Sequence, residues 1–281
     1  MDTVAMTYKE PGIAKWTSGI CEANAIEIRY LRTGGNKPSL VALHGLMASG
    51  ACLSSLARSL EYNFDVVMPD ARGHGSSSTP SQGYLYRDHA EDVLGLIRAL
   101  KLNDPILLGH SMGGMTVAVV ASKLGSALRS VILVDPTFIS PEWQREVYES
   151  DVAEEHRQFL KMSRSDLLAQ SRLKHPNRSA EIIEHMTDAR LQTSLEAFEV
   201  LTPPNPDYRE LVSSIDAPIL LVLASSGIVS VEAARELQSL NPLLRYELIP
   251  DVGHGLPYDK PEHLGEVILS FSRSTVADSS R

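Results

Sequence analysis

Short apolar runs alternate with helical patterns along most of the chain. The apolar runs predict strands at residues 26–31, 40–43, 64–68, 106–108, 130–134, 219–223 and 245–249. Apolar residues at helical spacing predict helices at about residues 50–61, 84–100, 112–124, 231–240 and 261–271. Because most of these strands are apolar throughout and helices separate them, the pattern predicts a parallel sheet with helices on both faces.

The middle of the chain follows a different pattern. Residues 137–209 contain no convincing strand, and helical spacing dominates at residues 143–162, 165–173, 180–186 and 191–200. We interpret this stretch as a helical insertion between two strands of the sheet. The chain of 281 residues then consists of one core, residues 1–136 and 210–281, and the insertion at residues 137–209.

Composition and charge exclude several classes of protein. Apolar residues make up 43% and charged residues 22%, which is ordinary for a globular chain. The net charge of −9 argues against a nucleic-acid binder, which needs a basic face. Two cysteines, Cys21 and Cys52, cannot form a disulfide framework or a cysteine-rich zinc site.

Three features of the sequence bear on where in the cell the protein is located. The first ten residues have neither a basic start nor an apolar run, so no signal peptide is visible. Residues 105–122 are uncharged but contain three glycines, a histidine and two serines, so we interpret them as buried core rather than a membrane span. With two thiols expected to be reduced, we expect a cytoplasmic protein without membrane contact.

The pentapeptide GHSMG at residues 109–113 carries the main chemical signal. It follows a predicted strand and precedes a predicted helix, which is the context of a nucleophile elbow. The sharp turn holds Ser111 in a strained conformation, so its neighbours Gly109 and Gly113 must be small. The helix that follows supplies backbone N–H groups and the positive end of its dipole.

Three further motifs extend this signal. His44-Gly45 ends the second predicted strand, residues 70–76 read DARGHGS, and residues 251–254 read DVGH after a late strand. With these motifs in this order, residues 40–271 resemble the α/β-hydrolase superfamily. The resemblance implies an α/β-hydrolase fold: a mostly parallel eight-stranded sheet flanked by helices, with a helical cap inserted after strand 6.

The resemblance also assigns roles. Ser111 is the expected nucleophile, and His254 is the expected base because it follows a late strand as in the family. The histidines His44 and His74 belong to structural turns in the family. Backbone N–H groups of Met112 and Leu46 are expected to form the oxyanion hole, with Met47 as the alternative to Leu46.

The acid of the triad departs from the family pattern. The family places it after the seventh strand, but residues 224–230 read ASSGIVS and contain no carboxylate. Asp135, at the end of the strand at residues 130–134, occupies a second position that some relatives use. Three readings stay open: Asp135 orients His254, Glu232 does so, or the site has no functional acid.

The insertion is expected to line the substrate pocket. Trp143, Phe159, Met162 and Met186 are the candidate substrate-binding residues, and such a lining favours an apolar small molecule. No H-E-x-x-H or clustered metal ligands occur, and no G-x-G-x-x-G follows the first strand, so neither a metal nor another cofactor is expected. The sequence leaves a homodimer open.

These features favour one function over two others. The leading hypothesis is a serine hydrolase that cleaves a carboxylic ester or lactone through an acyl-enzyme. The first alternative is a C–C bond hydrolase or a cofactor-free lyase or dioxygenase at the same site. The second is a ligand-binding protein without catalysis, which the missing acid after the seventh strand keeps open.

Overall fold

The computed structural model describes residues 16–278, and an eight-stranded sheet forms their centre. The strands follow the spatial order β1-β2-β4-β3-β5-β6-β7-β8, and every pair from β4 to β8 is parallel. Their bounds are β1 Thr17–Ala23, β2 Ile26–Arg32, β3 Ser39–Leu43, β4 Asp65–Pro69, β5 Ile106–His110, β6 Ser130–Val134, β7 Ile219–Ser226 and β8 Leu244–Gly253.

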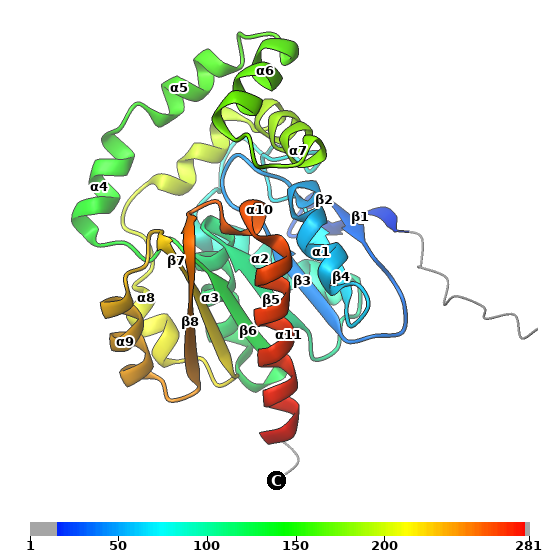
Figure 1. The fold of residues 1–281 in the computed structure, drawn as a ribbon, viewed down its shortest axis with the longest axis vertical. Helices are drawn as coiled ribbons and strands as arrows, with labels where there is room; N and C mark the ends of the chain where they lie inside the picture. The colour runs from blue at the N-terminus through cyan, green and yellow to red at the C-terminus, as the bar shows by residue number, and fades with distance from the viewer. Residues whose placement is uncertain (1–15, 279–281) are drawn as a thin grey trace, which may run out of the picture.

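Helices cover both faces of this sheet (Figure 1). On one face α1 packs against α11. On the other face α2, α3, α8 and α9 lie side by side in this order, and each helix packs against the next. The helices of these two layers are η1 Gly50–Leu53, α1 Ser54–Leu60, α2 Tyr86–Ala99, α3 Met112–Leu124, η2 Gly125–Ala127, α8 Tyr208–Ser213, α9 Val231–Leu240, α10 Leu256–Asp259 and α11 Pro261–Asp278.

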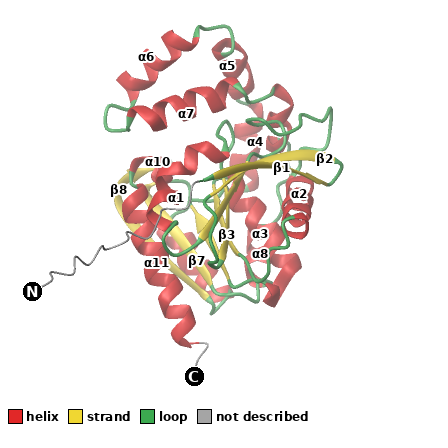
Figure 2. Ribbon diagram, turned by 90° about the vertical axis from the view of Figure 1, so that its right-hand side faces the viewer, coloured by secondary structure: helices red, strands yellow, loops and turns green. Residues whose placement is uncertain are grey.

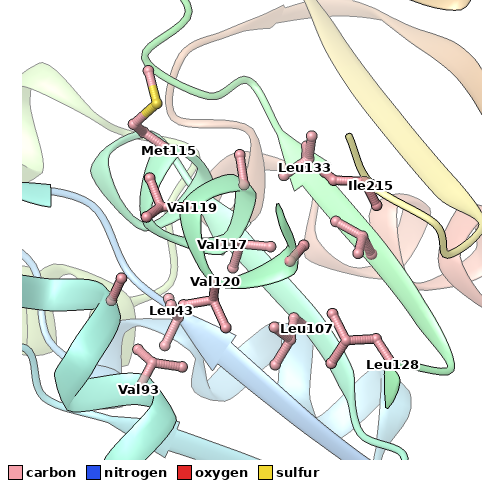
Figure 3. Packing of buried hydrophobic residues seen from close by; sticks show 14 of the residues in the cluster. Leu43, Val93, Leu107, Met115, Val117, Val119, Val120, Leu128, Leu133 and Ile215 are labelled. Carbon is pink, nitrogen blue, oxygen red and sulfur yellow. The ribbon is translucent and has the colours of Figure 1, made fainter. Parts of the chain in front are cut away.

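Alternation along the strands creates one core on each face. In β5, Leu107 packs into the cluster beneath α2 and α3, whereas Ile106 and Leu108 pack into the cluster beneath α1 and α11. Figure 3 shows Leu107 beside Val117 and Val120 of α3. Burial on both faces explains why the central strands are apolar throughout. This packing also holds the carboxyl ends of these strands in place.

Most predicted elements are confirmed, and the exceptions have local causes. The predicted strands and core helices all occur, with α3 and α9 at the predicted bounds. The strand β1 was missed because it is an edge strand with a half-exposed, largely polar sequence. The helix α11 continues to Asp278, beyond the predicted end at residue 271.

The residues between β6 and β7 are helical, as expected from the sequence. They form α4 Pro141–Glu149, α5 Val152–Phe159, α6 Arg164–Lys174, α7 Ala180–Leu191 and η3 Leu195–Leu201. The single helix expected at residues 143–162 is broken because Ser150 adopts an extended conformation. Figures 1 and 2 show α6 and α7 beyond α10 at one end of the molecule. We call residues 137–209 the cap segment.

Within residues 16–278, no helix is long and apolar enough to cross a membrane. The ten N-terminal residues, on which the signal-peptide prediction depends, lie outside the described residues.

Candidate active site

Ser111 lies at a strained turn between β5 and α3. Its φ of 56° and ψ of −120° are rare for a residue with a side chain. A Cβ on Gly113 would lie 2.5 Å from the backbone oxygen of Leu43, so this position must be glycine. The Ser111 N–H donates to the Val134 carbonyl at 3.2 Å, which ties the turn to β6. The local packing therefore holds the hydroxyl at the carboxyl end of the sheet.

His254 meets Ser111 at the carboxyl edge of the sheet. It follows the last residue of β8, and its Nε2 lies 2.9 Å from the Ser111 Oγ. With a neutral ring, the hydroxyl donates to Nε2. This geometry lets His254 take the proton of the Ser111 hydroxyl. Ser111 and His254 are 143 residues apart in sequence, so only the fold brings them together.

Asp135 holds the other nitrogen of the same ring. The Nδ1–H of His254 donates to Oδ2 of Asp135 at 2.6 Å, and Asp135 is 0% exposed. Asp135 directly follows β6 and has a φ of 39°. Burial alone would raise the pKa of this carboxyl, but hydrogen bonds from His254 and from two backbone N–H groups outweigh it and hold the pKa below its ordinary value.

The loop after β7, where the family places its acid, supplies those backbone donors instead. Ile228 N–H lies 2.9 Å from Oδ1 of Asp135, and Val229 N–H lies 3.1 Å from the same oxygen. Gly227 lets the loop approach this closely. Glu232, the alternative acid, is an exposed residue in the first turn of α9 and is not among the residues that line the cavity beside Ser111.

Two backbone segments meet beside the Ser111 hydroxyl. Met112 begins α3, and Leu46 lines the cavity into which Ser111 opens. A Cβ on Gly45 would lie 3.1 Å from the Ser111 Cβ, so the chain around Leu46 passes close to the serine. The N–H of Met47 donates to His74 Nε2 at 3.3 Å, which removes Met47 as an oxyanion donor.

His110 has a position that the sequence analysis did not anticipate. Its Nε2–H donates to the His254 carbonyl at 2.7 Å, and its ring lies 4.7 Å from the His254 ring. Burial lowers the pKa of His110 to about 3, so the ring is neutral. His110 therefore holds the backbone of His254 in place. Its only sequence signal is its place beside Ser111.

The remaining motif residues hold loops. His44 Nε2 accepts the Ala71 N–H at 3.0 Å, so it serves a turn as expected. Asp70 and Arg72 do not pair with each other. Asp70 accepts the Gly50 N–H at 2.8 Å, and Arg72 Nε donates to Asp92 of α2 at 2.6 Å. The partner on α2 could not be read from the local motif.

A cavity that is open to solvent on one side lies between Ser111 and the cap segment. Phe159 and Met186 line it, but Trp143 and Met162 do not. Trp143 is 40% exposed because α4 turns Gln144, rather than Trp143, toward the protein interior. Helical spacing alone could not show which side of α4 faces inward.

The cavity lining also contains polar and charged side chains that the sequence analysis did not name. Apolar residues contribute, but so do residues from α6, α7 and the loop between them, namely Gln170, Ser171, Lys174, His175, Arg178, Thr187 and Arg190. The lining therefore combines the expected apolar side chains with polar and charged ones. Among residues 16–278, no cluster of His, Cys, Asp and Glu side chains could hold a metal ion.

Known proteins resemble this chain over most of its length. A 2-(acetamidomethylene)succinate hydrolase of Mesorhizobium japonicum is 27% identical over 252 residues, covering 86% of this chain and 90% of that protein. An N-formylmaleamate deformylase of Pseudomonas putida is 28% identical over 247 residues, covering 86% of this chain and 91% of that protein.

Solved structures show the same fold. An E-2-(acetamidomethylene)succinate hydrolase superposes with a TM-score of 0.78 at 24% identity, covering 92% of this chain and 99% of that one. An enol-lactonase of Burkholderia xenovorans superposes with a TM-score of 0.72 at 22% identity, covering 90% and 99%. The family described as alpha/beta hydrolase fold matches residues 38–261. Because this match spans well over half of the sequence, the chain belongs to the alpha/beta hydrolase fold family.

Proposed function

We propose that this protein is a serine hydrolase that cleaves a carboxylic ester or lactone of a small molecule through an acyl-enzyme. One observation carries the proposal: Ser111 Oγ, the His254 ring and the buried Asp135 carboxylate form a continuous chain of contacts at 2.9 and 2.6 Å. A neutral histidine held in one tautomer by a carboxylate is the arrangement that activates a serine hydroxyl.

The reaction follows from these contacts. His254 Nε2 takes the proton of Ser111 as Oγ bonds to the substrate carbonyl carbon, and the N–H groups of Met112 and Leu46 stabilise the oxyanion. The bond to the leaving alcohol breaks, and His254 returns its proton to that oxygen. Water then attacks the acyl-enzyme by the same route, which releases the acid and restores Ser111. In a lactone, the alcohol stays attached to the acyl group.

Asp135 contributes by position and charge. Its three contacts, one from His254 and two from the loop after β7, keep it ionised and fix the ring orientation. The carboxylate stabilises the imidazolium that forms when Ser111 loses its proton. A ligand-binding protein without catalysis has no need of this arrangement, so the contacts favour an enzyme.

Hydrolysis of a related bond is the second candidate. Two similar proteins are a 2-(acetamidomethylene)succinate hydrolase and an N-formylmaleamate deformylase, and neither is named as an esterase or a lactonase. The polar and charged side chains among the apolar ones in the cavity lining favour a substrate that carries charged or hydrogen-bonding groups beside its apolar part. The same nucleophile and base serve either bond.

A fluorophosphonate probe tests the proposed nucleophile. We expect one covalent adduct on Ser111 by mass spectrometry, together with hydrolysis of phenyl pentanoate. Ser111→Ala should lose both, while Ser122→Ala, a serine of α3 bonded only to the Val119 carbonyl, serves as the matched control. Absence of an adduct on the native protein, or undiminished hydrolysis by Ser111→Ala, would contradict the proposal.

A further inference from the structure

Two polar groups on α7 are buried without a partner. Thr187 is 2% exposed, and its Oγ1 makes no hydrogen bond within the described part of the chain. The Nε of Arg190 is equally inaccessible and equally unpaired. Buried donors and acceptors in native proteins are nearly always satisfied, so two on one helix call for an explanation.

Thr187 and Arg190 share one face of α7. They are three residues apart, which places their side chains next to each other on a helix. Both line the cavity that contains Ser111 and His254. Both side chains therefore form part of the wall of the proposed substrate cavity.

The surroundings of Arg190 prepare it to bind an anion. Its guanidinium lies 3.9 Å from the centre of the Phe159 ring, which holds the planar group in one orientation. Among residues 16–278 it forms no ion pair. Burial lowers the pKa of its guanidinium and outweighs the opposite effect of Glu155. A partly buried guanidinium without a carboxylate lacks the partner that such groups normally have.

The other cations of the cavity differ from Arg190. Arg178 is already bonded to Asp259, with its Nε 2.6 Å from Oδ1. Lys174 is exposed at the end of α6. The Arg190 guanidinium therefore differs from these two cations because it is partly buried, is held in one orientation by Phe159 and has no carboxylate partner.

We propose that Arg190 and Thr187 form a subsite for a carboxylate group of the substrate, so that this hydrolase acts on an ester or related compound that carries a free carboxylate. This inference rests on the proposed function of Ser111. A planar carboxylate has two oxygens, of which one can accept from the guanidinium and the other from the Thr187 hydroxyl.

Binding of simple dicarboxylates tests the subsite without turnover. We expect succinate, glutarate or adipate to raise the melting temperature of the native protein more than sodium chloride at equal ionic strength does. Arg190→Leu should weaken that binding at least about tenfold, as expected for loss of a hydrogen bond to a charged group. Thr187→Val, which keeps the side-chain shape, should weaken it by a smaller factor without lowering the melting temperature of the free protein.

A matched control and a comparison anion complete the binding test. Arg172 is an exposed cap-segment arginine of α6 whose side chain lies 3.9 Å from Glu184, outside the cavity lining. Arg172→Leu removes the same charge and should bind the dicarboxylates as the native protein does. The proposal is overturned if none of the three dicarboxylates stabilises the native protein, if Arg190→Leu and Arg172→Leu behave alike, or if inorganic phosphate binds more tightly than the dicarboxylates.

Substrate selectivity supplies the second readout. Monophenyl glutarate and phenyl pentanoate have acyl chains of equal length and differ by one carboxylate. The ratio of kcat/KM for the acid over the neutral ester should fall at least about tenfold in Arg190→Leu. If Ser111 is unreactive and neither ester is cleaved, the proposed function fails while dicarboxylate binding still reports on the subsite. If both esters are cleaved with an unchanged ratio, only the subsite fails.

Discussion

Gly227 lies directly against the carboxylate of Asp135. A Cβ at this glycine would stand 2.5 Å from both carboxylate oxygens, closer than real Cβ atoms approach such groups. The contact lets the next two backbone N–H groups reach Asp135 from the loop after β7. The position where the family places its acid therefore serves the acid of β6 instead.

The first prediction concerns this contact. Gly227→Ala should displace either the loop or Asp135 and lower kcat roughly 10²-fold, because small displacements of an oriented group cost that much. Gly253→Ala is the matched control, since its Cβ would meet only the Ser226 carbonyl oxygen at an ordinary 3.5 Å. Steady-state kinetics with phenyl pentanoate measures the effect, and equal rates for the two variants would refute the role given to Gly227.

The second prediction concerns the identity of the acid. Asp135→Asn should lower kcat by up to about 10⁴-fold, as in another serine hydrolase, because the amide favours the wrong histidine tautomer. Glu232→Gln should change little, since Glu232 is exposed on α9. A pH–rate profile with each variant checks this. Near-native activity of Asp135→Asn would show that His254 works without this acid.

The third prediction concerns how the cap segment is held over the cavity. Arg178, whose side chain is 8% exposed, bonds to Asp259 of α10 and so joins the loop between α6 and α7 to the core. Arg178→Met should leave Asp259 unpaired, loosen this end of the cap segment and raise KM about tenfold.

Proteolysis and a second arginine distinguish this effect from general destabilisation. Arg164 pairs with Asp188 at the surface, entirely within the cap segment. Because exposed pairs contribute little, Arg164→Met should keep KM near its native value. Limited trypsin digestion should cleave Arg178→Met faster within residues 137–209 than it cleaves Arg164→Met. Equal digestion rates would contradict the anchoring role.

The fourth prediction concerns stability at low pH. Burial lowers the pKa of His89 and of His110 to about 3, against an ordinary value of 6.5. The unfolded chain therefore takes up protons below pH 6.5 that the folded chain refuses until about pH 3. The contribution of these neutral histidines to the free energy of unfolding is fully present above pH 6.5. It declines as the pH falls from 6.5 toward 3, by up to about 1.4 kcal/mol per pH unit for each histidine.

Urea unfolding between pH 7.5 and 4.5 measures this decline. His89→Gln should reduce the slope, because it removes one of the buried titrating rings. His263→Gln, at an exposed position on α11, should leave the slope as it is. A free energy of unfolding that stays constant or rises as the pH falls would contradict the prediction.

The sequence by itself determined the fold and the residues from which the site is built. Ser111 was identifiable because a strained turn between strand and helix demands glycine neighbours, and this demand is local in sequence. His254 and Asp135 were identifiable because the resemblance to α/β-hydrolases places the base after a late strand and, in some relatives, the acid after strand 6. The carboxyl ends of parallel strands share one edge of the sheet. Continuous apolar strands likewise revealed the sheet, except at the half-exposed edge strand β1.

Only the tertiary structure decided what depends on contacts between distant segments. It placed Asp135, and not Glu232, against the His254 ring, because the loop after β7 and the tip of β6 are adjacent only in the folded sheet. It paired Arg72 with Asp92, and it removed Trp143 and Met162 from the cavity. It also placed Arg190 and Thr187 in the wall of the cavity that contains Ser111. The direction in which a cap helix faces depends on the packing of that helix and not on its own residue pattern.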